Sequence, residues 1–328
     1  EVFMYTPVEL ALSPIEGIVS VPDSPLSDTS VALLSIPPTT DRNELDKVLP
    51  MMRLEWRPND DLLFFARYAT GLRNGSANAS QAQLLNQLAN NRAEAENAVY
   101  EHDFLRNYEL GAKMTLLDGS LVITAGAFLN EWDDLQVLVQ DPFLVVVNAG
   151  EASSSGFEAE SLFYISDHWS VFLNGTYADA QVDKGFQASS DKFIEKGTKL
   201  PYSQRYSFSG GLNYNNSLWD VPYSIRPSFS YVGSHTSTFG VEPNDSLDKD
   251  YFMMGDYALV NLIMDIGYEP WKVALKVTNV FNKIERISRT DARGLYESLS
   301  GGTPPPEPMN TTTTNTPRSI SLSFSYQF

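Results

Sequence analysis

The sequence predicts an all-β fold, an antiparallel transmembrane β-barrel with about twelve strands in this chain. Three observations predict it. Apolar and polar residues alternate along segments of about ten residues, as a strand with two different faces requires. The connections between these segments alternate between short turns and long polar loops. Aromatic residues gather near the segment ends, which suits belts at two membrane interfaces.

The expected strands run from residues 1–12 to residues 318–328, and most carry apolar residues at every second position. That spacing puts the apolar set on one face of a strand. In chain order the clear sets are Met52, Leu54 and Trp56; Tyr108, Leu110, Ala112, Met114 and Leu116; Tyr206, Phe208, Leu212 and Tyr214; and Tyr223, Ile225, Phe229 and Tyr231. In residues 121–130 the sequence does not decide which alternate positions lie on the apolar face of the strand.

The last segment, residues 319–328, alternates most regularly, with serines and Gln327 between its apolar residues. A helix with 3.6 residues per turn could not separate these two sets. The apolar set resembles the signal by which the barrel-assembly machinery recognises its clients through strand addition. The alternative is that these residues only face lipid, and both can hold. The set is Ile320, Leu322, Phe324, Tyr326 and Phe328.

The connections fall into two kinds. Short turns are expected at residues 57–61, 117–120, 166–168, 215–220 and 269–270, all rich in turn-forming residues. Long polar connections are expected at about residues 17–47, 74–101, 183–199, 235–250 and 283–317, and we expect them to carry no core. Periplasmic turns and longer extracellular loops are typical of outer-membrane barrels.

Composition excludes several other classes. The 328 residues carry a formal net charge of −18 and contain no cysteine. Nucleic-acid binding would need clustered Lys and Arg, which are absent, so no nucleic-acid partner is expected. No apolar run approaches the roughly 18 residues of a membrane-spanning helix.

No catalytic, cofactor-binding or metal-ligating residue is predicted, and the chain is not expected to be an enzyme. The three histidines, His102, His168 and His235, lack ligand or triad spacing and suit turns and loops. Residues 244–250 offer oxygen ligands but lack the glycine and final glutamate of a calcium loop, which favours a solvated acidic loop.

A soluble β-sandwich binding module is the alternative fold, because sandwich strands alternate too. Three features favour the barrel: charged and small residues share the polar faces, aromatic residues mark strand ends, and the chain ends within a strand at Phe328. The charges expected to point inward, to a plug, a passing solute or water, are Arg53, Arg57, Arg67, Glu109, Lys113, Glu158, Glu160, Arg205, Arg226 and Lys276.

Several segments resemble the C-terminal barrel of TonB-dependent outer-membrane receptors. The segment from Trp56 to Leu62 that leads to Tyr68-Ala69-Thr70-Gly71 resembles a turn and rising strand of the family, and Tyr108-Glu109-Leu110-Gly111-Ala112-Lys113 resembles another strand. The most specific match is Asn148-Ala149-Gly150-Glu151-Ala152 with Gly156-Phe157-Glu158-Ala159-Glu160.

Near the end, the segment Leu275 to Lys283, which contains Asn279 and Phe281, resembles the family's "L-x-V-x-N-L-F-[DN]-K" signature. Pro317-Arg318 then precedes the terminal strand, as is usual in the family. Glu285 replaces the tyrosine common two residues after that lysine, so the local loop is expected to differ. The signature residues are Asn148, Gly150, Gly156, Glu158, Glu160, Asn279 and Phe281.

The resemblance implies TonB-dependent uptake of a scarce ligand, such as a metal chelate, cobalamin or an oligosaccharide, across the outer membrane of a Gram-negative bacterium. It implies that residues 1–328 are the C-terminal part of a barrel of about 22 strands. The plug and TonB box are not visible here. The implied partners are outer-membrane lipid, the barrel-assembly machinery, TonB through a missing N-terminal region, and the remaining strands and plug. A passive outer-membrane channel is the alternative function.

Overall fold

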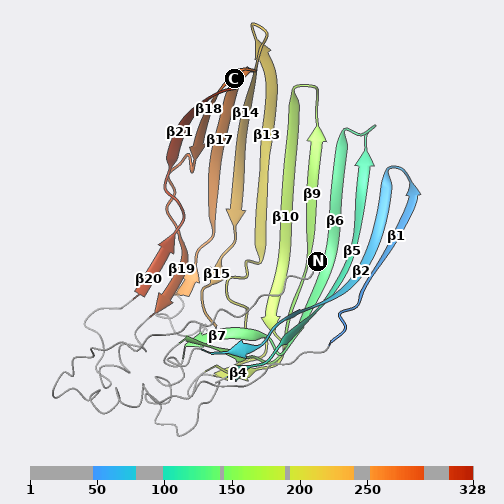
Figure 1. Cartoon of the computed structure of the whole chain (residues 1–328), viewed down its shortest axis with the longest axis vertical. Helices are drawn as coiled ribbons and strands as arrows, with labels where there is room; N and C mark the ends of the chain where they lie inside the picture. Colours follow the sequence, from blue (N-terminus) through green and yellow to red (C-terminus); the bar gives the residue numbers. More distant parts are fainter. Residues whose placement is uncertain are drawn as a thin grey trace, which may run out of the picture. The chain divides into compact units, whose positions relative to one another are not determined.

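Eleven long strands form one antiparallel sheet in the computed structural model, each paired with its neighbours in chain order (Figure 1). The structure describes residues 47–78, 99–140, 144–188, 193–239, 252–291 and 310–327. The eleven strands are β1 Met51–Asn59, β2 Leu62–Arg73, β5 Asp103–Leu116, β6 Leu121–Asp133, β9 Ala152–Tyr164, β10 Trp169–Val182, β13 Tyr206–Leu218, β14 Val221–Val232, β17 Tyr257–Tyr268, β18 Trp271–Thr278 and β21 Ser319–Tyr326.

The register of the sheet confirms the predicted alternation. Leu322 lies beside Leu275, Leu275 beside Met264, and Met264 beside Ile225, so one apolar face continues from strand to strand. The other face carries the polar residues. The open question at residues 121–130 is settled by the pairing of Ala127 with Leu110, which puts Leu121, Ile123, Ala125, Ala127 and Leu129 on the apolar face.

Aromatic residues border the apolar face on both sides. In β10, β13 and β14 the bordering pairs are Trp169 and Tyr177, Tyr214 and Tyr206, and Tyr223 and Tyr231, each eight residues apart. Rings contact across strands on both borders, as in Trp169–Tyr214 at 4.4 Å and Tyr177–Tyr206 at 5.3 Å between centroids. Eight residues at about 3.3 Å and a tilt of about 40° span about 20 Å, close to the apolar band of outer-membrane barrels.

Two aromatic residues near strand ends, Trp132 and Tyr257, do not border the apolar face. Trp132 pairs with Leu105 and Tyr257 with Val232, positions that alternate onto the polar face. Both stand near strand ends, and proximity to a strand end does not by itself fix which face a residue takes.

The apolar face is exposed rather than covered by a second sheet. Leu173, at its centre, is 51% exposed, and Leu322 is 73% exposed. A β-sandwich would bury these side chains between two stacked sheets. The sandwich alternative is therefore wrong. No helix of the described part of the chain has the length and apolar character needed to cross a membrane.

Short turns join the strands at one end of the sheet and small hairpins extend from the other (Figure 1). In the turn between β13 and β14, Trp219 and Asp220 are both left-handed, which matches a tight two-residue hairpin. We call the opposite end the loop end. Its two-stranded sheets are β3 Ser76–Ala77 with β4 Val99–Tyr100, β7 Gln136–Gln140 with β8 Leu144–Asn148, β11 Phe186–Gln187 with β12 Phe193–Ile194, β15 His235–Thr236 with β16 Met253–Met254, and β19 Arg286–Asp291 with β20 Asn310–Thr314.

The loop end carries the hydrophobic core, contrary to the sequence prediction. Its hairpins β7–β8 and β11–β12 bury a cluster against the end of β10. The pattern was hidden because the cluster combines short apolar stretches from separate loops, and because the connection after Asp133 was not recognised as long. The cluster consists of Val137, Val139, Val147, Ala149, Val182, Phe186 and Ile194.

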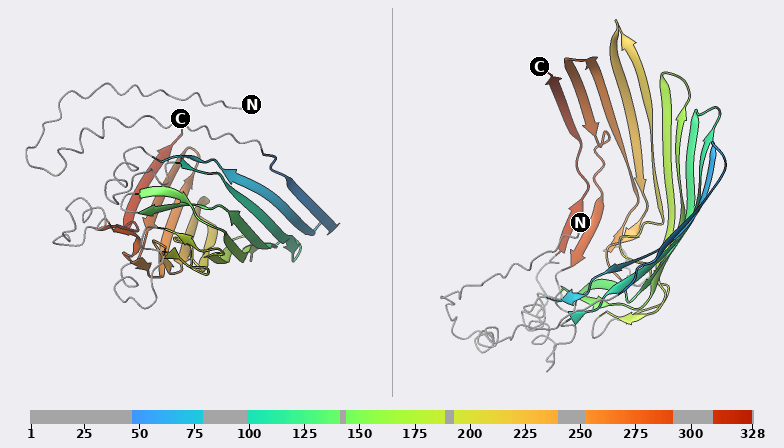
Figure 2. Two further views of the ribbon diagram at one scale, coloured as in Figure 1. Left: turned by 90° about the horizontal axis from the view of Figure 1, so that it is seen from below. Right: turned by 45° about the vertical axis from the view of Figure 1, so that its right-hand side comes forward.

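The sheet is curved and has two free edges among the described strands, β1 and β21 (Figure 2). Every described residue of β1 and β21 is exposed. About twelve strands were expected and eleven are present in the sheet; the first expected strand, residues 1–12, lies outside the described residues, as does the acidic segment 244–250.

Candidate functional site

The polar face of the sheet carries a set of partly paired charges. Arg67 and Glu109 lie side by side on β2 and β5, with 3.8 Å between guanidinium and carboxylate. Asp265 accepts from Arg226 at 2.6 Å and lies 2.5 Å from the Lys272 ammonium. Glu158 and Glu160 alternate onto the same face of β9 and are exposed. This face is suited to water or a polar partner.

Most of the charges expected on this face take positions there, but Arg205 makes a different contact. Its guanidinium donates to Asp179 at 3.3 Å, and Lys199 also pairs with Asp179. Asp179 stands two residues beyond Tyr177 and therefore shares its face, the apolar one, just above the aromatic border. Arg205 precedes β13, so strand alternation did not constrain its side chain.

Three phenylalanines on the polar face lie directly opposite glycines of the next strand. The pairs are Phe65 with Gly111, Phe128 with Gly156, and Phe172 with Gly211. A Cβ at Gly156 would stand 2.0 Å from the Tyr177 carbonyl oxygen and 2.9 Å from the Phe128 ring. Glycine at 156 therefore lets neighbouring backbone and ring approach, which accounts for one signature residue.

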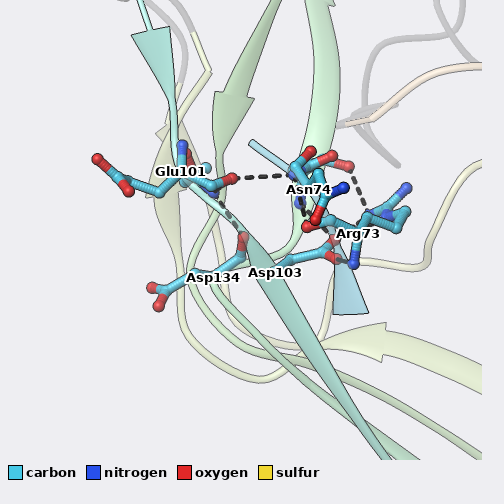
Figure 3. A network of polar contacts seen from close by, with 7 residues as sticks. Arg73, Asn74, Glu101, Asp103 and Asp134 are labelled. Carbon is cyan, nitrogen blue, oxygen red and sulfur yellow. Dashed lines mark hydrogen bonds and ion pairs between the residues drawn. The ribbon is translucent and has the colours of Figure 1, made fainter. Parts of the chain in front are cut away.

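At the loop end a buried carboxylate joins two connections (Figure 3). Asp103, only 2% exposed, accepts from the backbone N–H of Arg73 at 3.2 Å and from its Nε at 2.8 Å. The Gln136 N–H donates to the same carboxylate at 3.1 Å, and the Arg73 guanidinium donates to the Gln136 carbonyl at 3.1 Å. A buried charge with this many partners is stable and fixes its surroundings.

The signature residue Asn148 extends this network. Its amide donates to the carbonyls of Glu101 at 3.1 Å and Asp134 at 2.9 Å, and its oxygen accepts from the Glu101 N–H at 2.7 Å. Asn148 thus joins the β4–β5 connection to the turn before β7. A side-chain amide supplies both the two N–H donors and the acceptor oxygen that these contacts use.

Gly150 allows a third connection to come close. A Cβ at this position would stand 2.6 Å from the Lys184 carbonyl oxygen. The Glu151 carbonyl next to it accepts from the N–H groups of Asp183 at 2.7 Å and Lys184 at 3.1 Å. The signature stretch at 148–152 therefore ties neighbouring loop connections together through backbone contacts.

A pocket of about 370 Å³ opens beside this network. Its wall includes Gly71, Leu105 and Trp132, which lie in one row across β2, β5 and β6 on the polar face. The pocket is mostly apolar although it lies on the polar side of the sheet. The lining residues are Gly71, Leu72, Arg73, Asp103, Leu105, Trp132, Leu135 and Leu200.

The second signature is organised around Asn279, which is 3% exposed and left-handed with φ 51°. Its amide donates to the carbonyls of Lys283 at 2.8 Å and Thr316 at 3.0 Å, and its oxygen accepts from the Lys283 N–H at 2.9 Å. Asn279 therefore holds the turn after β18 against the segment entering β21. Phe281, by contrast, is 76% exposed.

Glu285, the departure from the family pattern, has local partners. Its carboxylate lies 2.8 Å from the Lys283 ammonium and raises the pKa of that lysine. Its backbone N–H donates to the Asn315 side chain at 2.7 Å.

Asn279→Asp is expected to destabilise the chain by about 1–3 kcal/mol, because a buried acceptor would replace the donor that faces two carbonyls. Asn282→Asp is the matched control. Asn282 is also left-handed, with φ 52°, but its side-chain oxygen accepts from Arg318 N–H at 2.9 Å, and aspartate keeps that acceptor. Thermal unfolding of the intact protein in detergent should separate the two variants, and equal melting temperatures would contradict the assigned role.

The histidines lie in turns and loop hairpins, as predicted. His168 contacts the Asn215 carbonyl at 2.9 Å, and His102 accepts from the Gly75 N–H at 3.0 Å. Within the described ranges no three His, Asp or Glu residues gather in a way that could hold a metal ion.

Comparison with known proteins agrees with the fold of the sheet. The family model described as "TonB dependent receptor-like, beta-barrel" matches residues 23–280. The chain is 25% identical over 167 residues to the TonB-dependent siderophore receptor PiuA of Acinetobacter baumannii, covering 49% of this chain and 22% of PiuA. It is 29% identical over 163 residues to the metal-pseudopaline receptor CntO of Pseudomonas aeruginosa, covering 48% of this chain and 20% of CntO.

Solved structures share the fold. The ferric yersiniabactin uptake receptor FyuA of Yersinia pestis superposes with a TM-score of 0.64 at 18% identity, over 86% of this chain and 37% of FyuA. The siderophore receptor PiuA of Acinetobacter baumannii superposes with a TM-score of 0.59 at 16% identity, over 84% of this chain and 35% of PiuA. The chain spans about a fifth of the length of the curated relatives it matches.

The family match covers well over half of the chain, and it agrees with the single antiparallel sheet. These findings place the sheet in the outer membrane. The chain belongs to the TonB-dependent receptor family, as part of the β-barrel.

Proposed function

We propose that residues 1–328 are the C-terminal part of the barrel of an outer-membrane transporter that takes up a scarce ligand with energy supplied through TonB. The observation that carries this proposal is the open sheet. Its apolar face suits lipid, its polar face suits a plugged lumen, and its free edges need further strands. Backbone groups in lipid must be paired, which strands achieve only in a closed ring.

The direction of the two edges indicates what closes the ring. Every neighbouring pair is antiparallel and the described residues give the sheet eleven strands, so β1 and β21 run in the same direction. An antiparallel closure then needs an odd number of added strands. A second copy of this sheet also adds eleven strands, but in the same orientation across the membrane its β1 would run parallel to β21 of the first copy. We therefore propose that the missing strands come from the rest of the same receptor, about eleven of the family's 22.

The proposed partners follow from the two faces of the sheet. A plug from the rest of the receptor would meet the polar face, where the unburied carboxylates of Glu158 and Glu160 could accept hydrogen bonds from it. TonB would act through a region that precedes the plug. The long loops would face the outside and the end of β21 the periplasm, since outer-membrane barrels put their short turns on the periplasmic side.

The proposed ligand is a metal chelate, in preference to cobalamin or an oligosaccharide. The relatives are a siderophore receptor and a metal-pseudopaline receptor, and the fold matches a ferric yersiniabactin uptake receptor. Chelates of this kind are too large and too dilute for simple diffusion, which is consistent with a gated barrel.

Import into cells tests the proposal. The intact receptor would be expressed in cells lacking their own chelate receptors, with and without TonB, and supplied with ⁵⁵Fe chelates of the catecholate, hydroxamate and carboxylate classes. Uptake of at least one class that is lost without TonB is expected. Uptake that persists without TonB would favour the passive channel, and no uptake of any class would contradict chelate transport.

We also propose that β21 carries the signal for the barrel-assembly machinery. Its residues Ile320, Leu322, Phe324 and Tyr326 are each more than half exposed on the apolar face, at a free edge that strand addition could use. Deleting Phe328 is expected to lower the assembled yield severalfold while leaving synthesis unchanged, measured by heat-modifiable gel migration. Assembly at the wild-type yield would mean that the set only faces lipid.

A further inference from the structure

The pocket beside Asp103 is lined in part by a glycine, Gly71, which brings no side chain into it. Gly71 pairs with Leu105, and Leu105 with Trp132, so the three form one row across three strands. A Cβ built on Gly71 meets no described atom within 4 Å. The row therefore contains a gap between larger neighbours.

Neither backbone nor packing requires glycine at this position. Gly71 does not have the positive φ found at Gly119, Gly197 and Gly267. It also differs from Gly156 and Gly150, where an added Cβ would strike backbone oxygens. Within the described part of the chain, neither a positive φ nor a close neighbour accounts for glycine at 71, which lines the pocket.

The other walls are held in place by the loop-end contacts. Asp103 and Arg73 bind each other and Gln136, which fixes Leu135 beside them. Leu200 comes from a different connection and packs against the loop-end cluster. A preformed apolar wall of this kind costs little ordering when a ligand group enters.

The chemistry of the wall indicates what fits. Leucines and the indole of Trp132 provide apolar and aromatic surface, and the Arg73 charge is balanced by Asp103. Such a surface favours an uncharged ring, which can stack on the indole and displaces little bound water. The volume of about 370 Å³ is ample for one ring with substituents.

We propose that this pocket, opened by Gly71 and walled by Trp132, Leu105, Leu135 and Leu200, binds an aromatic ring of the imported ligand. The proposal rests on the transport function proposed above, because it places one group of the imported molecule on this chain. Gly71→Leu should fill the pocket without straining the sheet. Gly255→Leu is the matched control, since Gly255 likewise meets nothing within 4 Å, lacks a positive φ and lies outside the pocket.

Fluorine NMR of the intact receptor tests binding without knowledge of the ligand. The receptor would be labelled with 5-fluorotryptophan, the Trp132 resonance identified by its loss in Trp132→Phe, and phenol titrated as the probe. The Trp132 resonance should shift saturably in the wild type and in Gly255→Leu. In Gly71→Leu the apparent affinity should fall at least about tenfold, the discrimination that a filled apolar pocket gives. Gly71→Ala should lie between them.

The outcomes separate the pocket from the transport function. A Trp132 shift that is unsaturable, or equal in Gly71→Leu, would overturn the pocket even if ⁵⁵Fe uptake is normal. Saturable phenol binding with unchanged chelate uptake in Gly71→Leu would also overturn it, because the pocket would then not serve the imported ligand. Absence of uptake in the wild type would refute the transport function, while the phenol titration would still decide whether the pocket binds a ring.

Discussion

Gly156→Ala is expected to abolish assembly of the barrel or to destabilise it by about 3 kcal/mol or more, the upper end of overpacking costs. The new methyl group would lie 2.0 Å from the Tyr177 carbonyl oxygen and 3.0 Å from the Ala178 Cα, both in the backbone of β10. Backbone in a paired strand cannot move away without breaking ladder hydrogen bonds on both sides. The fraction of heat-modifiable, folded protein in isolated outer membranes measures the effect.

Gly71→Ala is the control for this substitution. It makes the same chemical change on the same face of the sheet, but no described atom lies within 4 Å of the new methyl group. It should assemble at close to the wild-type yield. Normal assembly of Gly156→Ala would show that β9 and β10 can separate locally, and would contradict the tight approach at this position.

Leu173→Arg is expected to destabilise the barrel by about 2–4 kcal/mol, the cost of a cation at the bilayer midplane of an outer-membrane barrel. Leu173 lies four residues from both Trp169 and Tyr177, which mark the two borders of the apolar face. Its side chain is half exposed on the apolar face. Denaturant unfolding in lipid vesicles measures the difference.

Asn174→Arg tests the assignment of the two faces. Asn174 follows Leu173 directly and faces the polar side, where its amide donates to Ser209 at 3.4 Å. An arginine there should cost well under 1 kcal/mol, as a hydrated lumen position tolerates charge. If Asn174→Arg proved as costly as Leu173→Arg, the polar face could not be a wet interior.

The sheet could be predicted from the sequence because one face meets lipid and the other does not. That difference imposes a period of two on every long strand, and a period of two also fixes which neighbours share a face. Ile320, Leu322 and Phe324 show it without ambiguity. The faces of residues 121–130 could not be predicted, because Val122 and Phe128 add apolar residues to the polar face. Only the pairing with β5 shows which residues lie on which face.

The candidate site was much less predictable. Asn148 and Gly150 were recognised as signature residues, but their roles depend on Glu101 and Lys184, which lie 47 and 34 positions away. Asp103 and the pocket were missed entirely. A lone aspartate at a strand start has no sequence pattern that marks it as buried, and a pocket walled by Gly71, Trp132 and Leu200 exists only after the loops have packed.

The location of the buried cluster has a consequence for how the molecule responds to its surroundings. The long strands expose apolar side chains that suit acyl chains, whereas β7, β8, β11 and β12 enclose their own apolar residues. The stability of the long strands and that of the loop-end hairpins therefore depend on different surroundings. Extraction into a harsh detergent should loosen the long strands first. The hairpins β7–β8 and β11–β12 should stay folded, and their amide protons should remain slow to exchange.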